Sequence, residues 1–326
     1  MTVQNLDTSC ETCDGRGVLT DNKDQDHDCP KCDGTGQLGP VKISEPGVYD
    51  LPVNEYHADP VEGGSLSSTG ARLMLPPNAP AIFKYRRDHP LIKKDFDFGH
   101  AAHQLVLGAG PQIVVVEDEW GKDPNEWRTN NVKARVQEVR DSGAVPIKPN
   151  DYEVVQEMAA AIRDHPVASA LISNGAPEQT LVWQDRRTGV WRRALLDWLP
   201  DGSASGRLIV SDYKTTNSAN PDAIQKACYS YGYHQQADWY LDGVTSLELA
   251  EDPAFVFIFQ EKTPPYLVTV AELDVVALRL AREKNREAID LYQECVAADR
   301  WPGYSDEIEL IPLPAWVENK YLRESM

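Results

Sequence analysis

The sequence predicts an α/β fold whose core elements follow the order helix, three strands, helix, strand. Three neighbouring segments, residues 180–184, 190–199 and 207–215, are rich in apolar and β-branched residues and are separated by turn residues. A long helix is expected after Pro221, and the apolar run at residues 255–259 predicts a buried central strand. We therefore expect a sheet that is covered by helices.

The remaining elements are predicted from helical periodicity, from strand composition and from capping residues. Serine and threonine residues before position 71 can cap a helix that begins there. The expected elements are helices over residues 71–75, 97–107, 127–141, 151–165, 221–241 and 273–298, and strands over residues 113–117 and 266–270.

The composition is that of an ordinary globular protein. The chain has 326 residues, of which 41% are hydrophobic and 25% are charged, and this length allows an ample core. No apolar run approaches the length of a membrane span, and the first residues lack the basic and apolar segments of a secretory signal. We therefore expect a cytoplasmic protein that has no membrane partner.

The formal net charge of −19 argues against indiscriminate binding of nucleic acids. It does not exclude an enzyme that cleaves nucleic acids, because a metal-binding cleft needs carboxylates and a local basic strip can still hold phosphates. Short basic clusters exist, for example at residues 84–87 and 192–193. Taken singly, each cluster is more typical of solvated surface.

Three regions of the chain differ in composition. Residues 1–40 hold four of the six cysteines, and residues 41–63 are rich in proline, glycine and acidic residues. The sequence therefore predicts a small metal-binding unit over residues 1–40, a linker or draped arm over residues 41–63, and one large domain over residues 64–326.

Two cysteine pairs have the spacing of a metal-binding knuckle. Cys10 and Cys13 begin a Cys-x-x-Cys-x-Gly-x-Gly motif that recurs at Cys29 and Cys32, with fifteen residues between the pairs. Four thiolates can close a tetrahedral Zn²⁺ site, while disulfides and an iron–sulfur cluster are the alternatives. The motif resembles the cysteine-rich repeats of DnaJ-type chaperones, and the two repeats present here imply one structural zinc ion.

A second constellation combines two carboxylates and a lysine on adjacent predicted strands. Asp197 lies on the second strand, and Asp212 and Lys214 lie on the third. Because side chains alternate along a strand, Asp212 and Lys214 face the same side, and a hairpin can bring Asp197 beside them. Carboxylates suit Mg²⁺, which activates water and a phosphodiester, and the ammonium group can orient that water or stabilise the developing charge.

Two further features fit such a site but have ordinary explanations when they are taken alone. His103 lies on a predicted helix among small and apolar residues, where a histidine is more often a core residue. Gln236 and Tyr240 are four residues apart and share one helical face, which is also typical of ordinary packing.

Together these features resemble one family. A Gly-x-x-x-His motif ending at His103, then Asp197, Asp212-x-Lys214 and a Gln-x-x-x-Tyr motif beginning at Gln236 occur in the order found in the RecB-type branch of the PD-(D/E)XK nucleases. Within that branch the chain is most similar to the exonuclease VIII (RecE-type) nuclease domain.

The resemblance implies a restriction-endonuclease-like core, with a mixed central sheet flanked by helices in the order αβββαβ. The similarity covers residues 60–326, and the longer matching stretches are residues 96–103, 210–216, 233–237 and 312–316.

The resemblance also implies ligands for Mg²⁺ or Mn²⁺. These are His103, Asp197, Asp212 and the backbone carbonyl of Tyr213. Glu178 matches an acidic position just before the first core strand, and it would act behind the ligands or on a second metal ion. The acid on the third strand is an aspartate where many relatives have glutamate, which the family pattern allows.

The same resemblance implies that Lys214 is the catalytic lysine and that Gln236 and Tyr240 position the DNA end or support the site. The cysteine unit is not part of the common nuclease core. It also differs from the iron–sulfur nucleases of this branch, whose cysteines flank the nuclease domain at both ends, and this difference favours zinc.

By resemblance, the expected activity is a Mg²⁺-dependent exonuclease that degrades linear duplex DNA from the 5′ end and leaves a 3′ single strand in phage-type recombination. A strand-annealing recombinase would be its partner, and a homo-oligomeric ring would surround the DNA. The alternatives are a structure-specific or single-strand endonuclease of the same fold and, from another class, a zinc-dependent protein-binding adaptor with an inactive nuclease fold.

Overall fold

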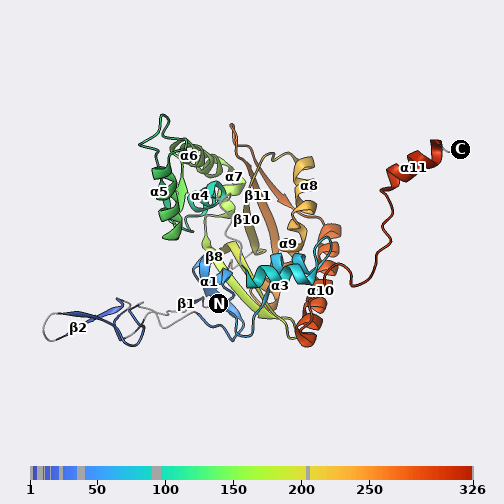
Figure 1. Ribbon diagram of the computed structural model, residues 1–326, viewed down its shortest axis with the longest axis horizontal. Coiled ribbons are helices and arrows are strands. Elements are labelled where there is room, and N and C mark those ends of the chain that lie inside the picture. Colours follow the sequence, from blue (N-terminus) through green and yellow to red (C-terminus); the bar gives the residue numbers. More distant parts are fainter. Residues whose placement is uncertain are drawn as a thin grey trace.

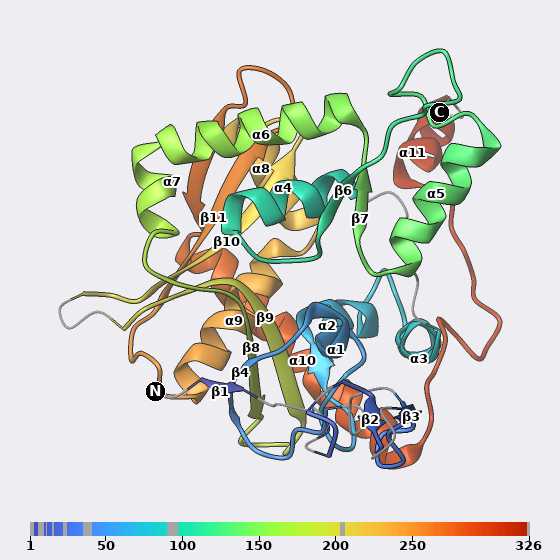
Figure 2. The same ribbon diagram turned by 90° about the vertical axis from the view of Figure 1, so that its left-hand side faces the viewer.

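The computed structural model describes residues 3–5, 10, 12–14, 16–21, 25–34, 41–89, 97–202 and 206–324. Its centre is an eight-stranded mixed sheet with helices on both faces (Figures 1 and 2). The strand order is β1-β4-β8-β9-β10-β11-β12, and β5 pairs with β9 beside that path. The predicted α/β fold is therefore confirmed.

The three central strands predicted from the sequence form an antiparallel meander, and β10 then pairs with β11 in parallel. Two short strand pairs, β2–β3 and β6–β7, lie outside this sheet. The main-sheet strands are β1 (Gln4–Asn5), β4 (Gly47–Asp50), β5 (Leu66–Ser67), β8 (Gly175–Gln184), β9 (Trp191–Pro200), β10 (Ile209–Thr216), β11 (Ala254–Glu261) and β12 (Val268–Glu272). The outer strands are β2 (Val18–Thr20), β3 (Asp26–Asp28), β6 (Ile113–Val115) and β7 (Val145–Ile147).

The helices divide between the two faces of the sheet, so that each face has its own apolar core. Helices α4, α6 and α7 cover one face, and α2, α9 and α10 cover the other (Figure 2). The helices are α1 (Val53–His57), α2 (Ser68–Met74), α3 (Pro80–Asp88), α4 (Asp97–Leu107), α5 (Asn130–Asp141), α6 (Pro149–Asp164), α7 (Pro166–Leu171), α8 (Pro221–Ser230), α9 (Tyr233–Ser246), α10 (Val275–Ala298) and α11 (Ala315–Glu324).

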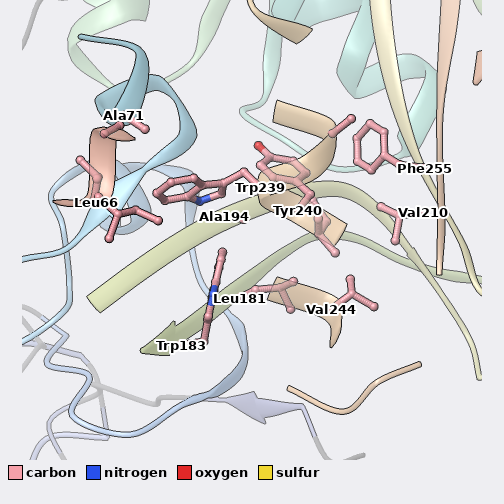
Figure 3. Close-up of a cluster of buried hydrophobic side chains, with 14 of the residues drawn as sticks. Leu66, Ala71, Leu181, Trp183, Ala194, Val210, Trp239, Tyr240, Val244 and Phe255 are labelled. Atoms are coloured by element: carbon pink, nitrogen blue, oxygen red, sulfur yellow. The ribbon is translucent and has the colours of Figure 1, made fainter. Parts of the chain in front are cut away.

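Two tryptophans tie α9 to the sheet. Trp183 of β8 and Trp239 of α9 are fully buried, and their rings meet edge to face (Figure 3). The guanidinium of Arg192 lies 4.7 Å from the Trp183 ring and 3.9 Å from the Trp239 ring, and it forms an ion pair with Asp242. Buried cation–π contacts of this kind stabilise the position of a helix. They fix the helix that carries Gln236.

The segment at residues 41–63, which the sequence predicts as a linker or draped arm, is instead built into the main sheet. Its strand β4 pairs with β8, and Val48 and Tyr49 are buried against that strand. The short strand β1 pairs with β4 in turn, so a part of the predicted 1–40 unit also belongs to the sheet. The surrounding proline and glycine residues hid this strand, because they shorten it to four residues.

The single long helix predicted after Pro221 is wrong, because the structure has two helices there. Helix α8 ends at Ser230, and Gly232 then adopts a left-handed φ of 68° before α9 begins at Tyr233. Glycine takes this conformation without steric cost, whereas other residues do not. Helix α9 also runs past the predicted end at residue 241 and continues to Ser246, and Gly243 within it packs directly under the Trp183 ring.

Gly175 begins β8, three residues before Glu178. We expect its replacement by alanine to destabilise the fold. Its φ is 147°, and an added Cβ would lie 2.7 Å from Pro200 Cα and closer still to the Leu199 carbonyl. The overlap and the backbone strain should cost about 3 kcal/mol in the free energy of unfolding, measured by chemical denaturation. Gly189→Ala is the matched control, because Gly189 also has positive φ but faces open space, and it should cost only about 1 kcal/mol. Equal losses would contradict this assignment.

Within the described residues, none of the helices is both long and apolar enough to cross a membrane.

Candidate active site and cysteine cluster

Three carboxylates lie in a row across three neighbouring strands. The register pairs Pro177 with Trp198 and Gln179 with Leu196, which places Glu178 of β8 opposite Asp197 of β9. The pairing of Trp198 with Ser211 then places Asp197 opposite Asp212 of β10. Glu178 has a positive φ of 50°, an uncommon conformation for a residue within a strand, and such conformations concentrate at functional sites.

The strand pairing loosens at this row. Among the described residues, the ladder between β9 and β10 consists of the Trp198–Ser211 pair, whereas β8 and β9 pair along most of their length. Next to the Trp198–Ser211 pair, the Tyr213 N–H donates to the Asp197 carboxylate at 2.8 Å instead of to a backbone carbonyl of β9. The Asp197 side chain is therefore held against the β10 backbone, beside the predicted carbonyl ligand of Tyr213.

His103 of α4 reaches two of the three carboxylates. Its Nε2 atom lies 3.3 Å from Asp197 Oδ1, and its Nδ1 atom lies 3.6 Å from Glu178 Oε1. The ring is therefore oriented by one acid near each of its nitrogens, as the rings of metal-binding histidines commonly are by a neighbouring carboxylate. The structure gives Glu178, which the sequence placed only loosely, a direct contact with His103.

Asp212 and Lys214 face α9, as the strand alternation predicts. The Asp212 carboxylate is 1% exposed; one oxygen accepts a hydrogen bond from Gln236 Nε2 at 2.6 Å, and the other forms an ion pair with Lys214 Nζ. The second oxygen is close to the ammonium group but has no hydrogen bond of normal geometry. The Lys214 ammonium also lies 5.5 Å from the centre of the Tyr233 ring.

Tyr240 completes the helical pair. It lies one turn after Gln236 on α9, is buried, and its hydroxyl interacts with the Gln236 side chain. On the opposite face of β10, the Tyr213 hydroxyl donates to Gln260 at 2.6 Å, and Gln260 in turn donates to the Met158 carbonyl at 2.8 Å. No sequence motif marks Gln260, whose contacts link β10 to α6.

The carboxylates differ in how readily they ionise. Burial, together with repulsion from Asp197, raises the pKa of Asp212 to about 6. Burial also opposes ionisation of Asp197, but His103 and Lys214 outweigh it and hold the pKa of Asp197 below its ordinary value. Neighbouring acids whose pKa values are pushed apart are typical of catalytic sites. Burial likewise raises the pKa of Glu178.

The surroundings of the two basic groups of the site favour their charged forms. Burial disfavours the ionised His103 ring and the Lys214 ammonium, but the acids around them outweigh this effect and raise both pKa values. The raised pKa of Lys214 makes it a fixed positive charge, which suits stabilisation of an anion better than proton abstraction.

Arg72 lies next to two tyrosines that border the site, and the sequence does not predict this position. It lies on α2, packs against Gly232, and is close enough to Tyr233 and Tyr240 to interact with their hydroxyl groups. Burial lowers the pKa of its guanidinium, and the described groups that counter this effect are these tyrosines rather than carboxylates. A half-buried arginine in such surroundings can hold a phosphate. No motif marks it, because its role depends on two elements that are far apart in the sequence.

The donor set fits a divalent metal ion. Asp197 and Asp212 supply carboxylate oxygens, the ligands that Mg²⁺ prefers, and His103 supplies an imidazole. A cation between the two acids would relieve the repulsion that raises the pKa of Asp212. It would also compete with Lys214 for the Asp212 oxygen that has no normal hydrogen bond.

The four cysteines form a tighter cluster than the acidic site. The ligand atoms of these four cysteines all lie within 4.8 Å of one another, and no other group of three or more metal-binding side chains among the described residues is so close. Cys10 Sγ lies 3.8 Å from Cys29 Sγ, and Cys13 Sγ lies 3.7 Å from Cys32 Sγ, so neither pair is a disulfide. Sulfurs arranged tetrahedrally at about 2.3 Å from a zinc ion lie about 3.8 Å apart.

The two knuckles share a backbone conformation at an equivalent position. Asp14 and Asp33, each following the second cysteine of its pair, both have a φ of 49°. In the first knuckle, the Gly17 N–H donates to Cys13 Sγ at 3.3 Å. Turns that direct N–H groups toward the sulfurs stabilise thiolates, and the repeated conformation is suited to holding one ion between the two knuckles.

Comparison with known proteins gives a matching family and several solved structures. The family model described as "PDDEXK-like domain of unknown function (DUF3799)" matches residues 93–314. One of the solved structures, described as "Putative exonuclease" from Eubacterium rectale, has a TM-score of 0.52 and 12% sequence identity. The match covers 78% of this chain and 92% of that chain, and at this identity it shows a shared fold. A search of curated proteins gives no match.

Proposed function

Because this chain belongs to the family of PDDEXK-like domains of unknown function (DUF3799), we propose that it is a metal-dependent deoxyribonuclease. One observation carries the proposal: Asp197, Asp212 and Lys214 meet where β9 and β10 separate, with His103 and Gln236 in contact with the two acids. Two carboxylates with an adjacent ammonium group suit hydrolysis of a phosphodiester. A protein-binding adaptor with an inactive nuclease fold would not need this arrangement.

Each side chain has a separate task in the proposed reaction. Asp197 and Asp212, with His103 and the Tyr213 carbonyl, would hold Mg²⁺ or Mn²⁺, which polarises the scissile phosphate and lowers the pKa of bound water. Lys214 orients the attacking water and stabilises the charge that develops on the phosphate.

The surrounding residues keep these groups in place. The Gln236 amide holds one oxygen of Asp212 at 2.6 Å, which leaves the other directed toward Lys214 and the metal position. Glu178 orients His103 from the side opposite Asp197. Tyr240 supports Gln236 one turn along α9.

The substrate is proposed to be the end of a duplex DNA. Lys214 provides positive charge beside the carboxylates, and Arg72 provides it beside Tyr233 and Tyr240, so a phosphate can approach although the net charge of the chain is −19. The direction, from the 5′ end to leave a 3′ single strand, is proposed from the resemblance to exonuclease VIII. So are the role in phage-type recombination and the strand-annealing recombinase as partner.

A comparison of linear and closed circular DNA as substrates distinguishes an exonuclease from an endonuclease of the same fold. We expect the purified protein with Mg²⁺ to degrade a linear duplex and to spare a covalently closed circle of the same sequence, because an exonuclease needs an end. Labelling the 5′ and 3′ ends separately reports the direction, and early release of the 5′ label is expected. Cleavage of the closed circle would assign an endonuclease of the same fold instead.

The cysteine cluster is proposed to bind one zinc ion with a structural role. All four ligand positions are filled by protein sulfurs, which leaves no open position for a substrate.

A further inference from the structure

Two tyrosines stand on either side of the glycine in the turn between α8 and α9. The ring centroids of Tyr231 and Tyr233 lie 5.7 Å apart, with an angle of 39° between the rings. Tyr233 is half-buried and packs against Phe257 and Phe259 of β11, whose ring centroids lie 5.5 Å and 5.9 Å away. Tyr231 is 60% exposed. The pair therefore extends from the core to the surface, and the packing of its inner ring fixes its position.

The tyrosine pair borders the acidic site. The Lys214 ammonium lies 5.5 Å from the centre of the Tyr233 ring. The Gly232 carbonyl accepts a hydrogen bond from the Gln236 N–H at 3.1 Å, so the turn is joined to the first turn of α9. A group that lies on the exposed ring of Tyr231 would therefore be close to the groups that bind the scissile phosphate in the proposed reaction.

Arg72 reaches the same turn from α2, which packs against α9. Its side chain lies against Gly232, where an added Cβ would come within 2.4 Å of Arg72 Cδ and 3.0 Å of Arg72 Nη1. Within the part of the chain that the structure describes, the Arg72 guanidinium has no ion-pair or hydrogen-bond partner, although the residue is half-buried. Its donors are therefore available to an anion that enters beside the turn.

We propose that Arg72 and Tyr231 form a subsite for one nucleotide of the DNA strand that enters the active site, with Arg72 on a phosphate and the base stacked on Tyr231. This subsite rests on the proposed nuclease function. A guanidinium fork matches the oxygens of a phosphate, and a tyrosine ring accepts any base, because every base has a flat π-face. The faces of a base inside a duplex are covered by its neighbours, so the subsite takes a nucleotide that has left the duplex.

Binding of a short single strand of thymidine nucleotides to the full chain tests the stacking contact. Fluorescence anisotropy with Ca²⁺ in place of Mg²⁺ measures affinity separately from the rate of hydrolysis. Tyr231→Ala should weaken binding by about tenfold, the loss typical of one stacked base, and Tyr231→Phe should keep the wild-type affinity because the ring remains. Tyr229→Ala is the matched control, since this exposed tyrosine stacks on His234 and lines a different depression, between α8, β12 and α10.

The salt dependence of the same binding equilibrium tests the phosphate contact. Arg72→Gln should weaken binding and reduce the slope of log K against log salt by about 0.7, because one contact with a single-strand phosphate is lost. Tyr231→Ala should weaken binding without a change in slope, because the ring carries no charge. A general folding defect would not separate the two effects in this way. An unchanged slope for Arg72→Gln would overturn the phosphate contact.

Oligonucleotides that lack one base, at each position in turn, locate the stacked nucleotide. The wild-type protein should lose about tenfold in affinity at one position, and Tyr231→Ala should lose nothing further at that position, because the contact is already absent. Equal affinities of wild type and Tyr231→Ala, or losses at every position that are the same in both proteins, would overturn the subsite. Hydrolysis of DNA by the wild-type protein would still support the proposed function in that case, whereas a wild-type protein that neither binds nor cleaves DNA would overturn both.

Discussion

Replacing Lys214 by alanine is expected to lower the rate of DNA hydrolysis by about 10²–10³-fold, the loss typical of removing one group that stabilises a developing charge. The ammonium is held at the site by Asp212 and stays charged, because the neighbouring acids raise its pKa. Its removal leaves the metal ligands in place. The rate should therefore be measured in single turnover at saturating DNA and Mg²⁺, where a loss of binding does not contribute.

Two further variants show whether the loss comes from the charge itself. Lys214→Met keeps most of the side-chain volume and should be as inactive as the alanine variant. Lys226→Ala removes an exposed lysine of α8 and should keep the wild-type rate. Thermal unfolding of each variant establishes that the fold is intact. A Lys214→Ala protein that cleaves DNA at the wild-type rate would refute the role given to this lysine.

Replacing Cys13 by serine is expected to reduce the zinc content of the purified protein from one ion per chain to none. The four sulfurs of the cluster lie within 4.8 Å of one another, and a serine hydroxyl replaces the thiolate poorly as a zinc ligand. The apparent free energy of zinc binding in such units is about 10–16 kcal/mol, and little else holds so small a unit together. Metal content by mass spectrometry, with limited proteolysis across residues 10–34, measures both effects.

Cys228→Ser is the matched control for the zinc prediction. Cys228 is buried in α8 within the main core and lies outside the cysteine cluster. This variant should keep one zinc ion. Iron and acid-labile sulfide in the wild-type protein would instead indicate a cluster of the iron–sulfur type, and disulfides with no metal would contradict the zinc assignment.

The sequence predicts the elements that carry the site because their signals are local. Residues 97–107 have helical periodicity, and α4 has the same bounds in the structure. Alternation along the third strand predicts that Asp212 and Lys214 share a face, and both contact groups on that face. The turn residues between the strands predict the hairpins that bring Asp197 beside them.

Long-range packing decided what the sequence could not predict. Strand β4 is short and surrounded by turn residues, so only its pairing with β8 reveals it. The division of the long helix depends on Gly232, which has a left-handed backbone and packs against Arg72 of the distant helix α2. The row of Glu178, Asp197 and Asp212 follows from the strand registers, which no local pattern specifies.

Hydrolysis of a 5′-labelled linear duplex by the wild-type protein, with and without Mg²⁺, tests the central claim most directly. That claim is that the acids around Asp197 and Asp212 support metal-dependent cleavage of a phosphodiester. We expect nucleotides to be released when Mg²⁺ is present, and release to stop when free divalent ions are removed and to resume when they are restored. Release that continues at the same rate without divalent ions, or an intact duplex in saturating Mg²⁺ or Mn²⁺, would contradict it.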